Sequence, residues 1–180
     1  MRNPRSTRAV LALAALLVTG CAATPMVTEE RVHFDVSRYR EVQVRVDSDQ
    51  GVRQQQGYDV TATDLLRSFV DALRATGKFA VVGTEGPAAS GKGSLDVRLA
   101  ITGLNYVSGA ARGLVGIAAG RAVLNVTMFV TDTETKEAVG VISAGHASHH
   151  GQGVFSPTTG RQAEAIGKEL AMKLAGAVKR

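Results

Sequence analysis

The feature that most constrains the fold of this chain is a repeated change in the spacing of its apolar side chains. Val42, Val44 and Val46 alternate with polar residues, which is the period of a strand with one buried face. From Leu65 the apolar residues recur every three or four positions, which is the period of an amphipathic helix. Strand spacing then returns before a second helical stripe closes the sequence. This order is typical of a fold in which helices and sheet form separate layers.

The pattern predicts an α+β, two-layer fold: a largely antiparallel sheet of about five strands, with two amphipathic helices on one face. Thr61 and Asp64 stand at capping-box spacing at the start of the first helix, and Gly77 is placed to end it. Residues 132–136 predict a hairpin turn. The predicted strands and helices follow in chain order: strand residues 32–36 and 42–46, helix 61–76, strands 79–82, 95–102, 124–131 and 137–147, and a helix from 159.

The first twenty residues are expected to leave the protein as a signal peptide. Three arginines and no acid precede the apolar run 9–18, which is about half the length needed to span a membrane. Thr19 and Gly20 are the small residues of a cleavage site, and Cys21, the only cysteine of the chain, follows directly. This arrangement resembles the lipobox of bacterial lipoproteins. The resemblance implies that Cys21 becomes an N-terminus carrying fatty acyl chains such as palmitate.

A lipidated Cys21 would anchor the protein to a membrane without a spanning helix, because each buried acyl methylene contributes about 0.8 kcal/mol. Ala22 follows in place of Asp, which by resemblance to enterobacterial sorting rules favours the outer membrane, facing the periplasm. We therefore expect a bacterial envelope protein in three parts. These are a signal peptide over 1–20, a lipid-anchored tether over 21–30, and a single α+β domain over 31–180.

Charge and composition argue against nucleic acid as a partner. The signal segment holds three of the 21 basic residues and none of the 16 acids, so the mature chain carries a net charge of only +2. Aromatic residues make up 4% of the chain and tryptophan is absent, which leaves no platform for stacking bases.

The segment 108–120 stands out as a candidate interaction loop. It is longer than the two to five residues of a plain hairpin connection, and it is rich in glycine and apolar residues. It is interpreted either as a contact surface for a partner backbone or a lipid, or as a loop that packs on its own sheet. The candidate contact residues are Arg112, Gly113, Leu114, Val115, Gly116, Ile117, Gly120 and Arg121.

Two patterns in the sequence are candidate sites of chemistry. His146, His149 and His150 lie within five residues, but on a strand His149 would point away from the other two, so no metal site is expected. Residues 86–92 nearly spell a phosphate-binding loop, but Gly93 stands where magnesium needs a hydroxyl, and strand spacing follows instead of a helix. No cofactor is predicted.

Several of these features resemble an uncharacterised bacterial lipoprotein family, domain of unknown function 4410. The resemblance rests on Arg112-Gly113, the glycine-rich run 115–122, the hairpin motif from Asp132 to Thr135, and the helix end at 77–79. Lys136 departs from the pattern, since a glycine often follows the Thr. The family implies an envelope location and this fold, and it implies no activity.

Two functional classes follow. The first is a non-catalytic envelope lipoprotein that binds a protein partner or itself, as an accessory of secretion, polymer export or surface assembly. The second is a periplasmic hydrolase or metal-dependent enzyme that uses the cluster of His146, His149 and His150. The sequence favours the first, because no acid, base and nucleophile are found in a recognisable motif.

Overall fold

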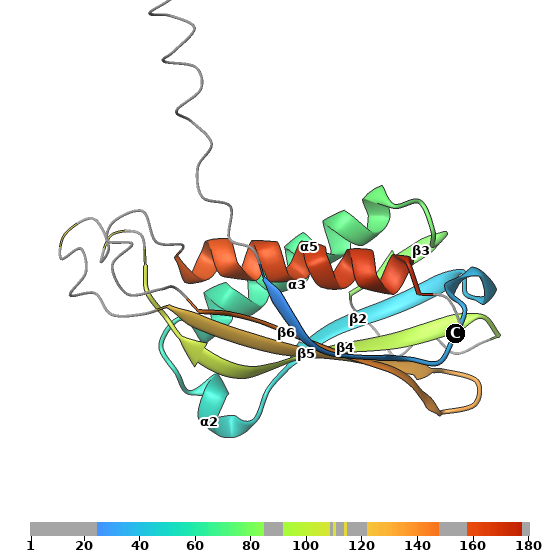
Figure 1. The fold of residues 1–180 in the computed structure, drawn as a ribbon, viewed down its shortest axis with the longest axis horizontal. Coiled ribbons are helices and arrows are strands. Elements are labelled where there is room, and N and C mark those ends of the chain that lie inside the picture. Colours follow the sequence, from blue (N-terminus) through green and yellow to red (C-terminus); the bar gives the residue numbers. More distant parts are fainter. Residues whose placement is uncertain are drawn as a thin grey trace, which may run out of the picture.

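The structure, a computed structural model, is built on one six-stranded sheet with two long helices packed on the same face (Figure 1). It describes residues 25–84, 92–108, 110, 114, 122–147 and 158–177. Across the sheet the strands lie in the order β1-β6-β5-β4-β2-β3. In chain order the strands are β1 (Met26–Val32), β2 (Glu41–Asp47), β3 (Val81–Gly83), β4 (Ser94–Asn105), β5 (Val123–Asp132) and β6 (Ala138–Ala147). The α+β class is confirmed, with six strands in place of about five.

The sheet is mixed, because it contains both antiparallel and parallel strand pairs. β4, β5, β6 and β1 pair antiparallel, and β5 and β6 are joined by the predicted hairpin turn. β2 instead runs parallel to both of its neighbours, β3 and β4. A parallel neighbour requires a crossover, and the helix between β2 and β3 provides it. The sheet is therefore antiparallel only over four of its strands.

The helices and short turns occupy the connections. The two long helices are α3 (Tyr58–Ala75) and α5 (Thr159–Ala175), and the short ones are η1 (Val36–Arg38) and α2 (Gln50–Arg53). The predicted capping box is wrong: α3 begins one residue after Gly57, and the Thr61 hydroxyl donates within the helix to the Gly57 carbonyl at 2.8 Å. Gly77 does end the helix, with a φ of 64° that glycine adopts without strain.

The core lies between the helices and one face of the sheet. Leu65, Phe69 and Leu73 of α3 are fully buried, as the helical stripe predicts. The fully buried large side chains contributed by the sheet and α5 are Leu95, Leu99, Ile101, Leu124, Met128, Ile142, Ile166, Leu170 and Leu174.

The opposite face of the sheet carries polar side chains that pair with one another. Arg45 of β2 forms a salt bridge with Asp96 of β4. The guanidinium of Arg98 lies 4.4 Å from the ring centre of Phe129, which shields part of that ring from water. Along each strand, side chains on this polar face alternate with side chains that point into the core, which explains the spacing of two residues in the sequence.

Three segments differ from the sequence-based expectation. The strand expected over 32–36 is wrong: β1 ends at Val32 and η1 begins at Val36, where the Asp35 carboxylate accepts the Ser37 N–H at 2.9 Å and so favours a turn over an extended strand. β1 begins at Met26, so residues 26–30, which were expected to form the tether, belong to the sheet. The segment 47–57, which lies between a predicted strand and a predicted helix, contains α2, whose first turn is capped by Asp49 through a 2.8 Å hydrogen bond from the Val52 N–H.

Candidate functional site

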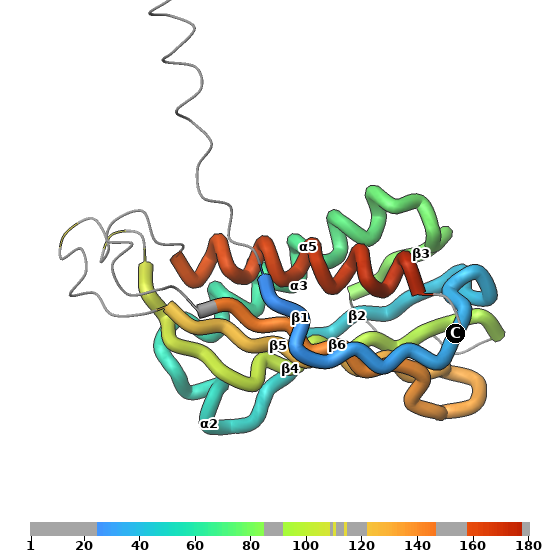
Figure 2. The backbone as a smooth tube through the Cα atoms, in the orientation of Figure 1, coloured from blue at the N-terminus to red at the C-terminus, as the bar shows by residue number. Residues whose placement is uncertain are grey.

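Several parts of the chain that bear on function leave the sheet at the same end. Asn105, the last residue of β4, pairs with Val123, the first of β5, and Val123 pairs with Ala147, the last of β6. Met26, the first residue of β1, pairs with Gly145 close by. The glycine-rich connection from β4 to β5 and the N-terminal segment therefore both join the domain at this end of the sheet (Figure 2). We refer to it as the β1 end.

Most of the candidate interaction loop lies outside the described residues. Of its eight candidate residues the structure describes Leu114 alone, whose side chain is 87% exposed. Met26, at the start of β1, is also exposed, at 68%. Cys21 lies outside the described part of the chain as well.

His146 is the one residue of the histidine cluster that the structure describes; His149 and His150 lie outside it. Gln162 of α5 is fully buried, and its amide nitrogen lies 3.2 Å from both the Ala122 carbonyl oxygen and His146 Nδ1. A carbonyl only accepts, so the amide must present its NH2 group to this side, and its second N–H then donates a hydrogen bond to Nδ1 of His146. With Nδ1 as the acceptor, a neutral imidazole at this position carries its proton on Nε2.

Gln162 joins three parts of the fold at the β1 end. Its two hydrogen bonds connect α5 to the end of the glycine-rich connection and to β6. A few residues away, Thr159 adds two bonds to the segment that follows β4, since its N–H donates to the Val107 carbonyl and its hydroxyl accepts from the Val107 N–H. The role of Gln162 was not foreseen, because a glutamine among helical residues carries no distinctive sequence signal.

The described part of the chain shows neither a metal site nor a membrane span. No three His, Cys, Asp or Glu side chains gather there closely enough to hold an ion. None of the helices in that part has the length and apolar character needed to cross a bilayer.

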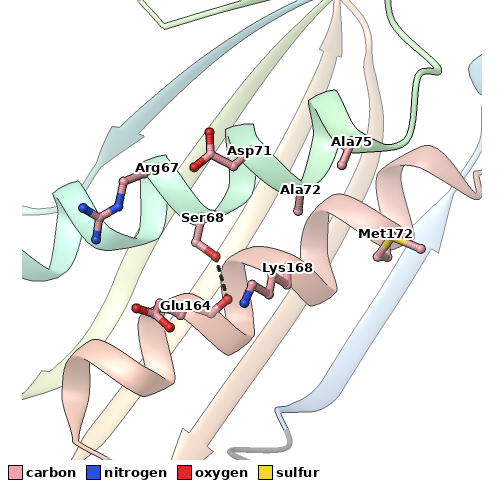
Figure 3. A pocket seen from close by; sticks show the side chains of 8 residues that line it. All are labelled: Arg67, Ser68, Asp71, Ala72, Ala75, Glu164, Lys168 and Met172. Atoms are coloured by element: carbon pink, nitrogen blue, oxygen red, sulfur yellow. Dashed lines mark hydrogen bonds between the residues drawn. The ribbon is translucent and has the colours of Figure 1, made fainter.

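A groove runs between α3 and α5 on the side of the helices that faces away from the sheet (Figure 3). It encloses about 580 Å³. Its lining residues are Arg67, Ser68, Asp71, Ala72, Ala75, Glu164, Lys168 and Met172. The sequence gives no sign of this groove, because polar and small residues on the outer face of a helix are also typical of a solvated surface.

At the bottom of this groove α3 and α5 are in close contact. A side chain added at Gly167 would place its Cβ 3.0 Å from the Leu65 carbonyl oxygen and from the Phe69 nitrogen. The Ser68 hydroxyl also donates to the Glu164 carbonyl oxygen at 2.7 Å, as Figure 3 shows. The two helices are thus fixed in register where they touch.

The rim of the groove carries charged side chains, and only some of them form ion pairs within the described part of the chain. Arg67 pairs with Asp64 one turn earlier in α3, at 2.6 Å. Within the residues that the structure describes, the side chains of Asp71, Glu164 and Lys168 form no ion pair. At the far end of the groove the Met172 side chain is 60% exposed.

The family hairpin motif has a structural role. Asp132 Oδ1 accepts the N–H groups of Glu134 and Thr135 at 2.8 and 3.1 Å, which closes the turn between β5 and β6. Lys136 completes this turn with a φ of 62°. It is the single non-glycine residue with positive φ in the described ranges, and that region favours glycine.

These elements define an α+β protein in which two helices, fixed in register, cover one face of a mixed sheet. The chain belongs to the family described as domain of unknown function (DUF4410), whose profile matches residues 33–151. A comparison with curated proteins found no match.

Solved structures of similar fold include PelC of Paraburkholderia phytofirmans. A single-substitution variant, a dodecamer, has a TM-score of 0.58 at 14% identity and covers 87% of this chain and 100% of its own. The PelC dodecamer in a second crystal form gives 0.57 at 15% identity, with 86% and 99% covered. At these identities the similarity establishes the fold.

Proposed function

We propose that this protein is a lipid-anchored component of the bacterial cell envelope that acts by binding and assembly, without catalysis. The observation that carries the proposal is the position of the first strand. β1 begins five residues after Cys21, and five extended residues reach about 17 Å. An acylated Cys21 would therefore hold the β1 end of the sheet next to the membrane.

The glycine-rich connection supports the same orientation. It leaves the sheet at the β1 end, and its Leu114 exposes 87% of its side chain. Exposed apolar surface costs about 25 cal/mol per Å² in water, so a lipid or protein that covers it gains that free energy. We infer that residues 108–120, with Arg112 among them and Arg121 directly after, contact the membrane or a partner bound close to it.

Self-association fits this role. The two PelC structures of similar fold are dodecamers, and their fold spans almost the whole of this chain. A lipid-anchored protein that assembles with its own copies would serve secretion, polymer export or surface assembly as an accessory. Ala22, in place of Asp after the anchored Cys21, supports the outer membrane over the inner membrane as the site of this protein.

The anchor is tested by labelling cells with a fatty acid and comparing the wild type with Cys21→Ala. We expect label in the wild type and none in the variant, with the wild-type protein in the outer-membrane fraction. Label that persists in the variant, or a wild type that takes up none, would overturn the anchoring.

The contact role of the glycine-rich connection is tested with Gly116→Leu. On a contact surface the larger side chain blocks association and leaves thermal unfolding unchanged. Gly91→Leu, in the connection between β3 and β4, is the matched control and is expected to keep both properties. A large fall in Tm for Gly116→Leu with unchanged association would show that the segment belongs to the core.

A further inference from the structure

We propose that the groove between α3 and α5 is the contact surface for a second copy of this chain, related by a two-fold axis that runs parallel to the two helices. The inference deepens the assembly role proposed above, and its orientation depends on the proposed lipid anchor. It rests on three properties of the groove: the direction of its helices, the order of its charges and the shape of its apolar end.

The two helices run in the same direction. Ser68 of α3 bonds to Glu164 of α5, and further along Ala75 and Met172 lie together at the other end of the groove (Figure 3). A two-fold axis parallel to both helices places α3 of one copy over α5 of the other. A rotation about this axis leaves the position of each residue along the helix direction unchanged. Residues of α3 and α5 that stand at the same level within one chain therefore face each other across the contact between two copies.

The charges along the rim are complementary under this operation. At one end of the groove the cation Arg67 on α3 is near the anion Glu164 on α5. One turn further, about 6 Å along the axis, the anion Asp71 on α3 is near the cation Lys168 on α5. When α3 of one copy covers α5 of the other, each cation meets an anion, and symmetry makes every pair twice.

The apolar end is complementary in shape. Met172 is 60% exposed and projects from α5, whereas the facing part of α3 carries the small side chains of Ala72 and Ala75. The same two-fold axis brings Met172 of each copy onto the alanines of the other. A flexible thioether side chain suits such a shallow recess.

The membrane selects this orientation over its alternative. A two-fold axis perpendicular to the helices would place the two β1 ends, and hence the two anchors, on opposite sides of the dimer. A parallel axis leaves both β1 ends on the same side, so two anchored copies can pair on one membrane surface.

The expected association is weak in solution and strengthened on the membrane. Eight lining residues on each side are fewer than the 20–30 of a standard stable interface. Anchoring two copies to one surface raises their effective concentration and so compensates for a small interface.

Cysteine cross-linking on vesicles tests the geometry directly, because the acylated Cys21 offers no free thiol. Lipidated Ala72→Cys and Met172→Cys proteins are reconstituted into phosphatidylethanolamine and phosphatidylglycerol vesicles, separately and as a mixture, and oxidised. We expect a disulfide-linked dimer in the mixture, several-fold more abundant than in either protein alone. Equal linkage in the separate samples, or none in the mixture, overturns the proposal.

Charge reversal supplies a second, independent measurement. Lys168→Glu is added to both proteins of the Met172→Cys and Ala72→Cys mixture, so that two negative charges face each other, at Asp71 of one copy and at position 168 of the other. We expect the yield of disulfide-linked dimer to fall at least about fivefold. Adding Asp71→Lys to both proteins reverses the pair as a whole and should restore it. Lys78→Glu, an identical change outside the groove, should have no effect. Failure of the double reversal to restore linkage contradicts the proposed pairing.

The same samples separate this inference from the proposed function. Flotation of the vesicles reports whether the protein is anchored, and linkage reports whether the groove pairs. If the protein does not float with the vesicles, the mixture is oxidised in solution at about 100 μM. A disulfide between the two different variants under those conditions would support the groove dimer, although the proposed lipid anchor would be wrong. A wild type that forms larger rings unaffected by Lys168→Glu overturns the groove contact and leaves self-association in place.

Discussion

The hydroxyl of Tyr39 donates a 2.7 Å hydrogen bond to the Asp132 carboxylate and so joins the segment after η1 to the hairpin between β5 and β6. Burial, followed by the hydrogen bond and the negative charge of Asp132, raises the pKa of Tyr39 to about 12. Burial of Asp132 opposes its ionisation, but hydrogen bonds from Tyr39, Thr135 and Glu134 outweigh that effect and hold its pKa below the usual value. The neutral phenol and the ionised carboxylate stabilise each other.

The first prediction follows from this pair. A tyrosine whose pKa is raised in the folded state contributes stability that is complete below pH 10 and is lost as the pH rises towards 12. We expect Tyr39→Phe to lower the free energy of unfolding by about 1 kcal/mol at pH 8 and to remove that alkaline loss. Denaturant unfolding between pH 8 and 11.5 measures both. An unchanged alkaline dependence in the variant would contradict the assignment.

The second prediction concerns the turn residue Lys136. Its φ of 62° strains any residue with a Cβ, so Lys136→Gly is expected to stabilise the protein by roughly 0.5–1 kcal/mol after the added entropy of the unfolded glycine is counted. Lys78→Gly is the control: Lys78 is not among the residues with positive φ, and the change should destabilise slightly. Thermal unfolding of both variants and the wild type measures the effect. A Tm for Lys136→Gly below that of the wild type would show that the backbone at Lys136 is not strained.

The third prediction tests the close contact between the helices. Gly167→Ala places a methyl group 3.0–3.1 Å from three atoms of α3, two of them backbone, so the helices must separate. We expect a loss of about 1–3 kcal/mol. Gly160→Ala in the same helix meets a single side-chain oxygen at 3.4 Å and should be neutral or stabilising, since alanine favours helix. Equal melting temperatures for the two variants would show that the contact is not tight.

The fourth prediction is that the protein binds no structural metal through its histidine cluster. Nδ1 of His146 accepts a hydrogen bond from the Gln162 amide, so that nitrogen is engaged. Chelator treatment should leave the melting temperature unchanged, and metal analysis of the purified protein should find no stoichiometric ion. A bound ion lost in the double variant His146→Ala, His150→Ala would reverse this conclusion and favour the enzymatic alternative.

The sequence predicted best those elements whose apolar period was uninterrupted. The stripe of α5 and the alternation of β4 appear in the structure as predicted, because each packs one face against the core. β1 was missed because its register shifts between Val27 and Glu29, which breaks the alternation, and because an edge strand buries little. α3 was predicted one turn too short, since Gly57 offers no side chain to cap it.

The groove and the Gln162 contacts could not be predicted from spacing, for a different reason. Both depend on how two helices far apart in the sequence meet. Gly167 permits the close approach, yet a single glycine within a helical stripe gives no indication of what lies against it. By contrast, the departure at Lys136 was visible from the family pattern, and the left-handed backbone there gives it a physical cost.

The pairing of β1 with β6 also has a consequence for the order of folding. Thr28 bonds to Ser143, 115 residues further along the chain. Pairing across so long a separation is slow compared with closing a local hairpin, and a polypeptide exported from its N-terminus presents β1 well before β6 has followed. Until then β1 has no partner strand. In the lipid-anchored protein proposed above, acylation of Cys21 would therefore precede completion of the sheet.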